Sequence, residues 1–123
     1  MPNSCLIDTN VLLRYLLDDN EQMGLIAEHI INSGAWTTPE VLAEVTYVLE
    51  SVYAVERPRI CAALEIILNH VETYPADIVL SAVREYKESG LDFVDCLIVA
   101  YSRAGNRVFT FDKGINKRLN SSS

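Results

Sequence analysis

Short apolar runs alternate along the chain with longer segments whose apolar residues recur at helical spacing. The short runs predict strands over residues 4–8, 35–37, 71–74 and 107–111. In the longer segments, Asn, Gly and Pro residues mark several of the expected helix ends. Helices are predicted over residues 11–17, 21–32, 39–53, 58–70, 77–89, 93–104 and 113–119.

The alternation of strands and helices predicts the fold class. Because parallel strands need crossover connections, we expect an α/β fold with three α/β/α layers and a central, mainly parallel sheet of four to five strands. The 123 residues suit one domain, expected over residues 1–120, with a flexible tail at 121–123. In open parallel sheets, ligands bind outside the carboxyl ends of strands. Asp8 and Asp112 follow two of these ends.

Composition narrows the class of protein. Half of the residues are hydrophobic and 22% are charged, which excludes disorder as the main state. No apolar run is long enough for a membrane helix, and the first residues lack a basic signal start, so we expect a cytoplasmic protein without membrane contact. Cys5, Cys61 and Cys96 show no paired spacing, which argues against disulfides or a zinc site and predicts buried thiols.

Charge is unevenly distributed along the chain. The net charge of −7 argues against indiscriminate binding to nucleic acid, because phosphate contacts need Lys and Arg. Residues 1–95 carry 5 basic and 16 acidic side chains, whereas residues 96–123 carry 5 basic and 1 acidic. The basic end is either an ordinary solvated surface or a phosphate-facing rim beside an acidic site. Arg14, Lys113 and Lys117 are candidate phosphate contacts, although solubility explains each of them equally well.

Three aspartates follow apolar segments. Asp8 and Asp112 end predicted strands, and Asp95 lies one turn into the most apolar helix. An unpaired carboxylate in such a place is costly to desolvate, and a bound cation would compensate all three. Oxygen ligands favour a hard ion, Mg²⁺ or Mn²⁺, whereas zinc is disfavoured because the two histidines are isolated.

Other polar residues near these aspartates have two interpretations each. Asp92 suits a helix N-cap and also a metal ligand, while Asn10 is equally suited to an N-cap and to a hydrogen bond with a ligand. Thr9 and Thr110 can hydrogen-bond and orient a neighbouring carboxylate. Glu44 lies at the edge of an apolar helix stripe, a position more typical of a boundary residue than of a site residue.

Four segments together resemble PIN-domain proteins, most closely the VapC-type toxin ribonucleases. The segments are LIDTNVLLRYL at 6–16, TPEVLAE at 38–44, LDFVDCLIVA at 91–100 and VFTFD at 108–112. The resemblance spans essentially the whole chain, and it places the acidic positions of the family on Asp8, Glu44, Asp95 and Asp112. It thereby raises Glu44 from a boundary residue to a catalytic candidate.

The resemblance implies a function, a cofactor and partners. It implies an Mg²⁺-dependent endoribonuclease that hydrolyses RNA phosphodiester bonds, with Asp8, Asp95 and Asp112 as metal ligands. Asp92 is a further candidate because its spacing of three residues puts it on the same helix face as Asp95. The resemblance also implies the toxin of a type II toxin–antitoxin pair, a cognate antitoxin protein and a homodimer. The alternative is a PIN-domain protein without a toxin role, either a different nuclease or a metal-binding module for RNA or protein.

Two other classes of acidic α/β protein fit less well. A response-regulator receiver needs paired acids at the end of the first strand and an isolated late lysine, whereas Asp8 is single and Asp112 directly precedes Lys113. A haloacid-dehalogenase-type phosphatase needs a second aspartate two residues after the first, where this chain has Asn10. Neither class is favoured.

Overall fold

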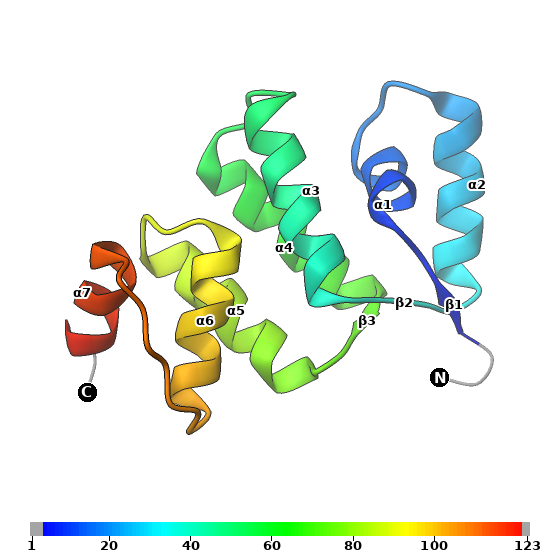
Figure 1. Ribbon diagram of the computed structural model, residues 1–123. Helices are drawn as coiled ribbons and strands as arrows, with labels where there is room; N and C mark the ends of the chain where they lie inside the picture. The colour runs from blue at the N-terminus through cyan, green and yellow to red at the C-terminus, as the bar shows by residue number, and fades with distance from the viewer. Residues whose placement is uncertain (1–3, 122–123) are drawn as a thin grey trace. The chain divides into compact units, whose positions relative to one another are not determined.

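The computed structural model describes residues 4–121, which divide into two compact units at the junction of Tyr74 and Pro75 (Figure 1). Each unit is described separately. The first contains β1 (Cys5–Leu6), α1 (Thr9–Leu16), α2 (Glu21–Asn32), β2 (Ala35–Thr37), α3 (Pro39–Ser51), α4 (Arg57–His70) and β3 (Glu72–Thr73). The second contains α5 (Ala76–Glu88), α6 (Phe93–Arg103) and α7 (Lys113–Ser121). No helix within residues 4–121 is long and apolar enough to cross a membrane.

The strands of the first unit form a parallel sheet in the order β1-β2-β3. Leu6 pairs with Trp36, and Thr37 pairs with Thr73. The buried hydroxyl of Thr37 also donates to the carbonyl of Ile7 at 3.0 Å, which extends the contact between β1 and β2 beyond the ladder. Two helices connect each pair of successive strands, as the parallel order requires. The predicted α/β class with a parallel sheet is therefore confirmed.

Polar side chains begin α2 and α3 where the sequence predicts them. Asn20 Oδ1 accepts from the amide of Met23 at 3.0 Å, and Thr38 Oγ1 accepts from that of Val41 at 3.3 Å. Pro39 follows Thr38 at the first helical position, where its missing amide costs no hydrogen bond. The helices then bury one apolar stripe each, formed chiefly by Leu12, Leu42, Val45, Ile60, Leu64 and Ile67.

The second unit is a helical cluster in which α6 packs against both α5 and α7 (Figure 1). The rings of Tyr86 and Phe93 lie 6.0 Å apart between their centres and connect α5 with the start of α6. Both rings are fully buried, so their contact contributes to the centre of this unit. The remaining core is supplied mainly by Val79, Ala82, Val83, Cys96, Val99 and Ala100.

The predicted strand at 107–111 is wrong, and the described residues form three strands rather than four to five. A strand needs a neighbouring strand for its main-chain hydrogen bonds, and the described elements of the second unit are all helices. Polar groups of the segment are satisfied locally instead, since Asn116 Nδ2 donates to the carbonyl of Thr110 at 3.0 Å. Phe109 and Phe111 remain 84% and 89% exposed and contact each other.

Burial near the amino terminus also differs from the prediction. Leu6 is 53% exposed, and Cys5 is exposed rather than buried, because the two residues of β1 pair with a single neighbouring strand. Cys61 is half-buried, and Cys96 is buried as expected. Ser121, assigned to the tail, is the last residue of α7, while residues 122–123 lie outside the described part of the chain.

Gly34 carries the turn from α2 into β2, and we expect Gly34→Ala to destabilise the protein by about 1 kcal/mol. Its φ of +107° disfavours any residue with a Cβ atom, although a Cβ there would meet only Ser4 Oγ, at 3.7 Å. Gly90→Ala is the matched control, because no heavy atom lies within 4 Å of the added Cβ. Urea unfolding measures both variants, and equal stabilities would contradict the assignment of backbone strain to Gly34.

Candidate active site

Asp8 begins α1. Its Oδ1 accepts a hydrogen bond from the amide of Val11 at 3.2 Å, and its backbone is extended, as an N-cap requires. Asn10 lies inside the first turn of the helix, so the alternative assignment of Asn10 as the N-cap is wrong. The cap leaves Oδ2 of Asp8 available to other partners at the positive end of a helix.

Glu44 lies on an exposed part of α3 and is connected to the start of α1. The hydroxyl of Thr9 donates a short hydrogen bond to Oε1 of Glu44, and these two residues are 35 positions apart in the chain. Thr9 directly follows Asp8, so this contact brings Glu44 to the same end of α1 as the Asp8 cap. The first unit thus gathers two of the four predicted acids.

Asp92 and Asp95 occupy the first turn of α6. The amide of Asp95 donates to Oδ1 of Asp92 at 2.9 Å, which confirms that Asp92 is the N-cap of this helix. A role of Asp92 as a metal ligand stays a prediction. Asp92 is exposed, whereas Asp95 is partly buried.

Asp112 lies at the start of α7 and accepts the same kind of hydrogen bond as Asp92 does at the start of α6. Its Oδ1 accepts from the amide of Ile115 at 2.8 Å. Thr110 does not contact the carboxylate: its hydroxyl accepts from the amide of Asp112 at 3.0 Å, which fixes the main chain at this point. Asp8, Asp92 and Asp112 therefore share one local geometry, an oxygen that accepts from the amide three residues later.

The acids of the second unit interact electrostatically. Partial burial raises the pKa of Asp95 above its ordinary value of 3.8, and the negative charges of Asp92 and Asp112 raise it further. The Coulombic effect of Asp112 on Asp95 means that the starts of α6 and α7 lie close enough for their charges to repel. This end of the unit concentrates negative charge.

The acids do not sit in the desolvated surroundings that the sequence suggested. Asp8, Glu44, Asp92 and Asp112 are exposed, so the expectation of a large burial cost for Asp8 and Asp112 is wrong. Main-chain amides at helix starts donate to Asp8, Asp92 and Asp112 instead. Among residues 4–121, no group of three or more His, Cys, Asp or Glu side chains is arranged to hold a metal ion. The donors themselves are all oxygen, which fits Mg²⁺ or Mn²⁺.

The candidate phosphate contacts differ in their surroundings. Arg14 Nη1 pairs with Asp19 Oδ1 at 2.9 Å, so its charge already has a partner. Lys113 and Lys117 are exposed and lie four residues apart on α7, which places them on one face. A cation at a helix N-terminus opposes the helix dipole, and Lys113 occupies such a position directly after Asp112.

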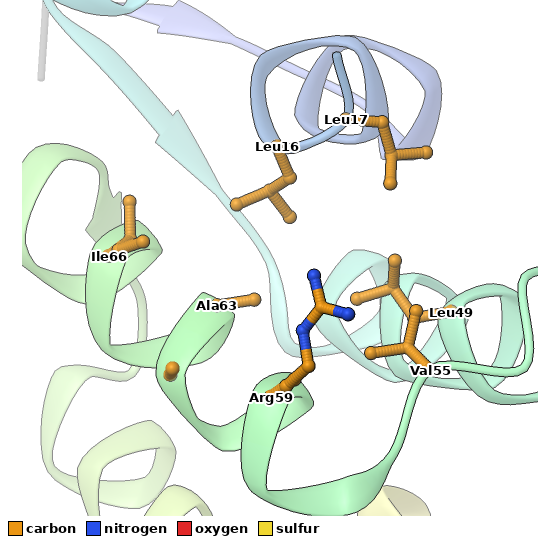
Figure 2. A pocket seen from close by; sticks show the side chains of 8 residues that line it. Leu16, Leu17, Leu49, Val55, Arg59, Ala63 and Ile66 are labelled. Carbon is orange, nitrogen blue, oxygen red and sulfur yellow. The ribbon is translucent and has the colours of Figure 1, made fainter. Parts of the chain in front are cut away.

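A pocket of about 250 Å³ lies in the first unit, between the end of α1 and helices α3 and α4 (Figure 2). Arg59 extends into it from α4, while the other side chains around it are apolar. None of the predicted acids lines this pocket, so it is separate from the candidate site. The lining residues are Leu16, Leu17, Leu49, Val55, Arg59, Ala62, Ala63 and Ile66.

Glu85, a residue not predicted from the sequence, is buried and contacts Arg103 and Arg118. A signal was present in the helical spacing, because Glu85 continues the buried face of α5 through Ile78 and Ala82. A charged residue on an apolar stripe requires a partner, since an isolated buried charge is strongly unfavourable. That spacing indicates a paired carboxylate but not the identity of its partners.

Asp95→Asn should raise the melting temperature at neutral pH by roughly 1–3 °C. A carboxyl group whose native pKa is raised destabilises the folded protein once it ionises, so the gain should shrink as pH falls toward 3.8. Glu40→Gln is the control, because Glu40 is an exposed acid that also lies in the first turn of a helix, α3. A lower melting temperature for Asp95→Asn, measured by calorimetry across this pH range, would contradict the assigned repulsion.

Comparison with known proteins places this arrangement in a family. The PIN domain family matches residues 5–118. A VapC ribonuclease from Aquifex aeolicus (strain VF5) is 34% identical over 101 residues, which cover 75% of this chain and 73% of the relative. No solved structure matches the chain significantly. The match over nearly the whole chain and the similarity to this relative show that the protein belongs to the PIN domain family.

Proposed function

We propose that this protein is a metal-dependent endoribonuclease that hydrolyses RNA phosphodiester bonds and acts as the toxin of a type II toxin–antitoxin pair. The observation that carries the proposal is membership of the PIN domain family together with acids at its four expected positions, Asp8, Glu44, Asp95 and Asp112. The similarity to a VapC ribonuclease supports the choice of RNA as the substrate. Residues 1–120 then act as one nuclease domain.

We assign the metal to Asp8, Asp95 and Asp112, with Asp92 as a further candidate and Glu44 as the fourth catalytic acid. When bound, Mg²⁺ would increase the acidity of water and neutralise negative charge on the phosphate. Support comes from the raised pKa of Asp95: partial burial raises it most, and the carboxylates of Asp92 and Asp112 raise it further, a repulsion that a bound cation would offset. Thr9 holds the carboxylate of Glu44, and Thr110 fixes the main chain of Asp112. Asn10 remains a candidate for orienting Asp8.

The basic end of the chain is proposed to bind the RNA backbone. Lys113 and Lys117 are exposed on α7, directly after the candidate ligand Asp112. Because Lys113 opposes the helix dipole, its position is better explained by a phosphate partner than by helix stability. Arg14 is the weaker candidate, since Asp19 already pairs with it.

A cognate antitoxin protein and a second copy of this chain are the proposed protein partners. Both follow from the resemblance to VapC-type toxins and from the similarity to the VapC ribonuclease. Co-expression with the product of the adjacent reading frame, followed by measurement of mass and of RNA cleavage, tests both partners together. An adjacent product that neither binds nor inhibits this protein would favour a PIN-domain nuclease without a toxin role.

Purified protein should cleave a pool of cellular RNA with Mg²⁺ and not with EDTA. Asp8→Asn and Asp95→Asn should each lower the cleavage rate by roughly 100-fold. Asn is also a good N-cap residue, so Asp8→Asn removes the charge and keeps α1 capped, whereas Asp8→Ala should cost a further ~1 kcal/mol of stability. Glu44→Gln is compared with Glu50→Gln, an exposed glutamate six residues along the same helix. Full activity in folded Asp8→Asn and Asp95→Asn would refute the assignment.

Metal binding should be visible without RNA. Mg²⁺ or Mn²⁺ that binds only the folded state raises the melting temperature, with about 2.7 kcal/mol gained at a hundred times the dissociation constant. The increase should disappear in Asp95→Asn and persist in Glu40→Gln. An unchanged melting temperature of the wild-type protein at millimolar metal would argue against a cation site.

A further inference from the structure

Glu85 joins the three helices of the second unit. Its side chain lies near the end of α5 and is only 4% exposed, which makes it the only buried acid among residues 4–121. Oε1 contacts Arg103 Nε of α6 at 2.8 Å, and Oε2 accepts from Arg118 Nε of α7 at 2.6 Å. Each carboxylate oxygen of Glu85 therefore contacts an arginine on a different helix.

Besides the contact of Arg118, α7 is held by close packing at its start. A Cβ atom at Gly114 would lie 3.0 Å from Leu91 Cδ2, so the first turn of α7 approaches the residue that precedes Asp92. Ile115 is buried in the same turn. Together with the contact between Arg118 and Glu85, this gives α7 two attachments, one apolar at its start and one ionic near its end.

Arg118 and Asp112 lie on the same short helix, α7, so the contact of Arg118 bears on the placement of Asp112. Asp112 caps α7 through the amide of Ile115, and Arg118 follows six residues later, about 9 Å along the helix axis. A helix this short moves as a rigid rod, so a change at Arg118 changes the direction in which the Asp112 end points. The apolar packing at Gly114 and Ile115 holds the start of α7, and the contact at Arg118 is needed to set its direction.

An ionic contact suits this task better than an apolar one. A buried ion pair contributes little net stability compared with packed apolar residues, because both charges must leave water. What it provides is direction, since an arginine N–H must point at a carboxylate oxygen within a narrow range of angles. The exposed Glu88 lies 3.5 Å from Arg118 Nη2, which is a weaker contact with the same arginine.

We propose that Glu85 is a positioning residue that orients α7 through Arg118 and so holds Asp112 beside Asp92 and Asp95. This inference rests on the proposed nuclease function, in which Asp112 is a metal ligand. The positioning role can nevertheless be measured without RNA cleavage, because it concerns the attachment of one helix.

The experiment compares Glu85→Gln with the wild-type chain by amide hydrogen exchange. The amides of Ile115 and Asn116 should exchange roughly tenfold faster or more, the size expected for one lost charge-assisted contact. Glu88→Gln is the matched control, being the same substitution on the same helix and facing the same arginine, and it should change these rates less than about twofold. Should Glu85→Gln fail to fold, Arg118→Gln removes the same contact from the partly exposed side of the pair.

A titration with Mn²⁺ alone separates positioning from a general loss of stability. Glu85→Gln should raise the Mn²⁺ concentration for half-maximal thermal stabilisation by roughly tenfold, the size of one lost charge-assisted contact. Val79→Ala, which truncates a fully buried residue of α5, should lower stability and leave that concentration unchanged. Unchanged exchange in Glu85→Gln, or an equal Mn²⁺ shift in Val79→Ala, would overturn the proposal. Wild-type protein that cleaves no RNA overturns the nuclease function instead, and the exchange rates still decide the role of Glu85.

Discussion

The hydrogen bond between an aspartate oxygen and the main-chain amide three residues later determines where the candidate acids of this protein stand. Asp8, Asp92 and Asp112 each make this bond at the start of a helix. The bond satisfies an amide that the helix itself leaves unpaired and places the carboxylate at the positive end of the helix dipole. One oxygen is used for structure, and the other remains available for chemistry. The same interaction that starts α1, α6 and α7 therefore also presents their acids to solvent, which explains why these side chains can be charged and exposed without a buried counter-ion.

Asp95 is held differently, and the difference has an energetic consequence. It lies inside the first turn of α6 and is partly buried, so its charge has less access to water than that of Asp92. The nearby charges of Asp92 and Asp112 add to this cost, and the pKa of Asp95 is raised. A fold under selection for stability alone gains nothing from this arrangement. A bound cation would remove the repulsion among these carboxylates, which is the physical basis of the proposed metal site.

Acidic residues thus play two separate roles in the second unit. Glu85 is buried, and each of its oxygens contacts an arginine, Arg103 or Arg118, so its charge is already compensated within the unit. Asp92 and Asp112 are exposed and only partly engaged. The buried acid connects the helices, whereas the acids at the helix starts keep an exposed carboxylate, as their proposed role requires. Arg118 connects the two groups, because it contacts Glu85 at one end of α7 while Asp112 caps the other.

Local features of this protein were determined by the sequence itself. The bounds of α2 at Glu21–Asn32, the cap at Thr38 and the cap at Asp92 all depend on residues within four positions of one another, which is the range of helical hydrogen bonds and capping contacts. Only the tertiary structure decided which predicted strands pair with a neighbour, and residues 107–111 are irregular despite their β-branched and aromatic residues. It also decided that Thr9 meets Glu44 and that Glu85 meets Arg118, across 35 and 33 positions. The physical reason is that spacing along the chain fixes which face a residue occupies, whereas packing alone selects what that face contacts.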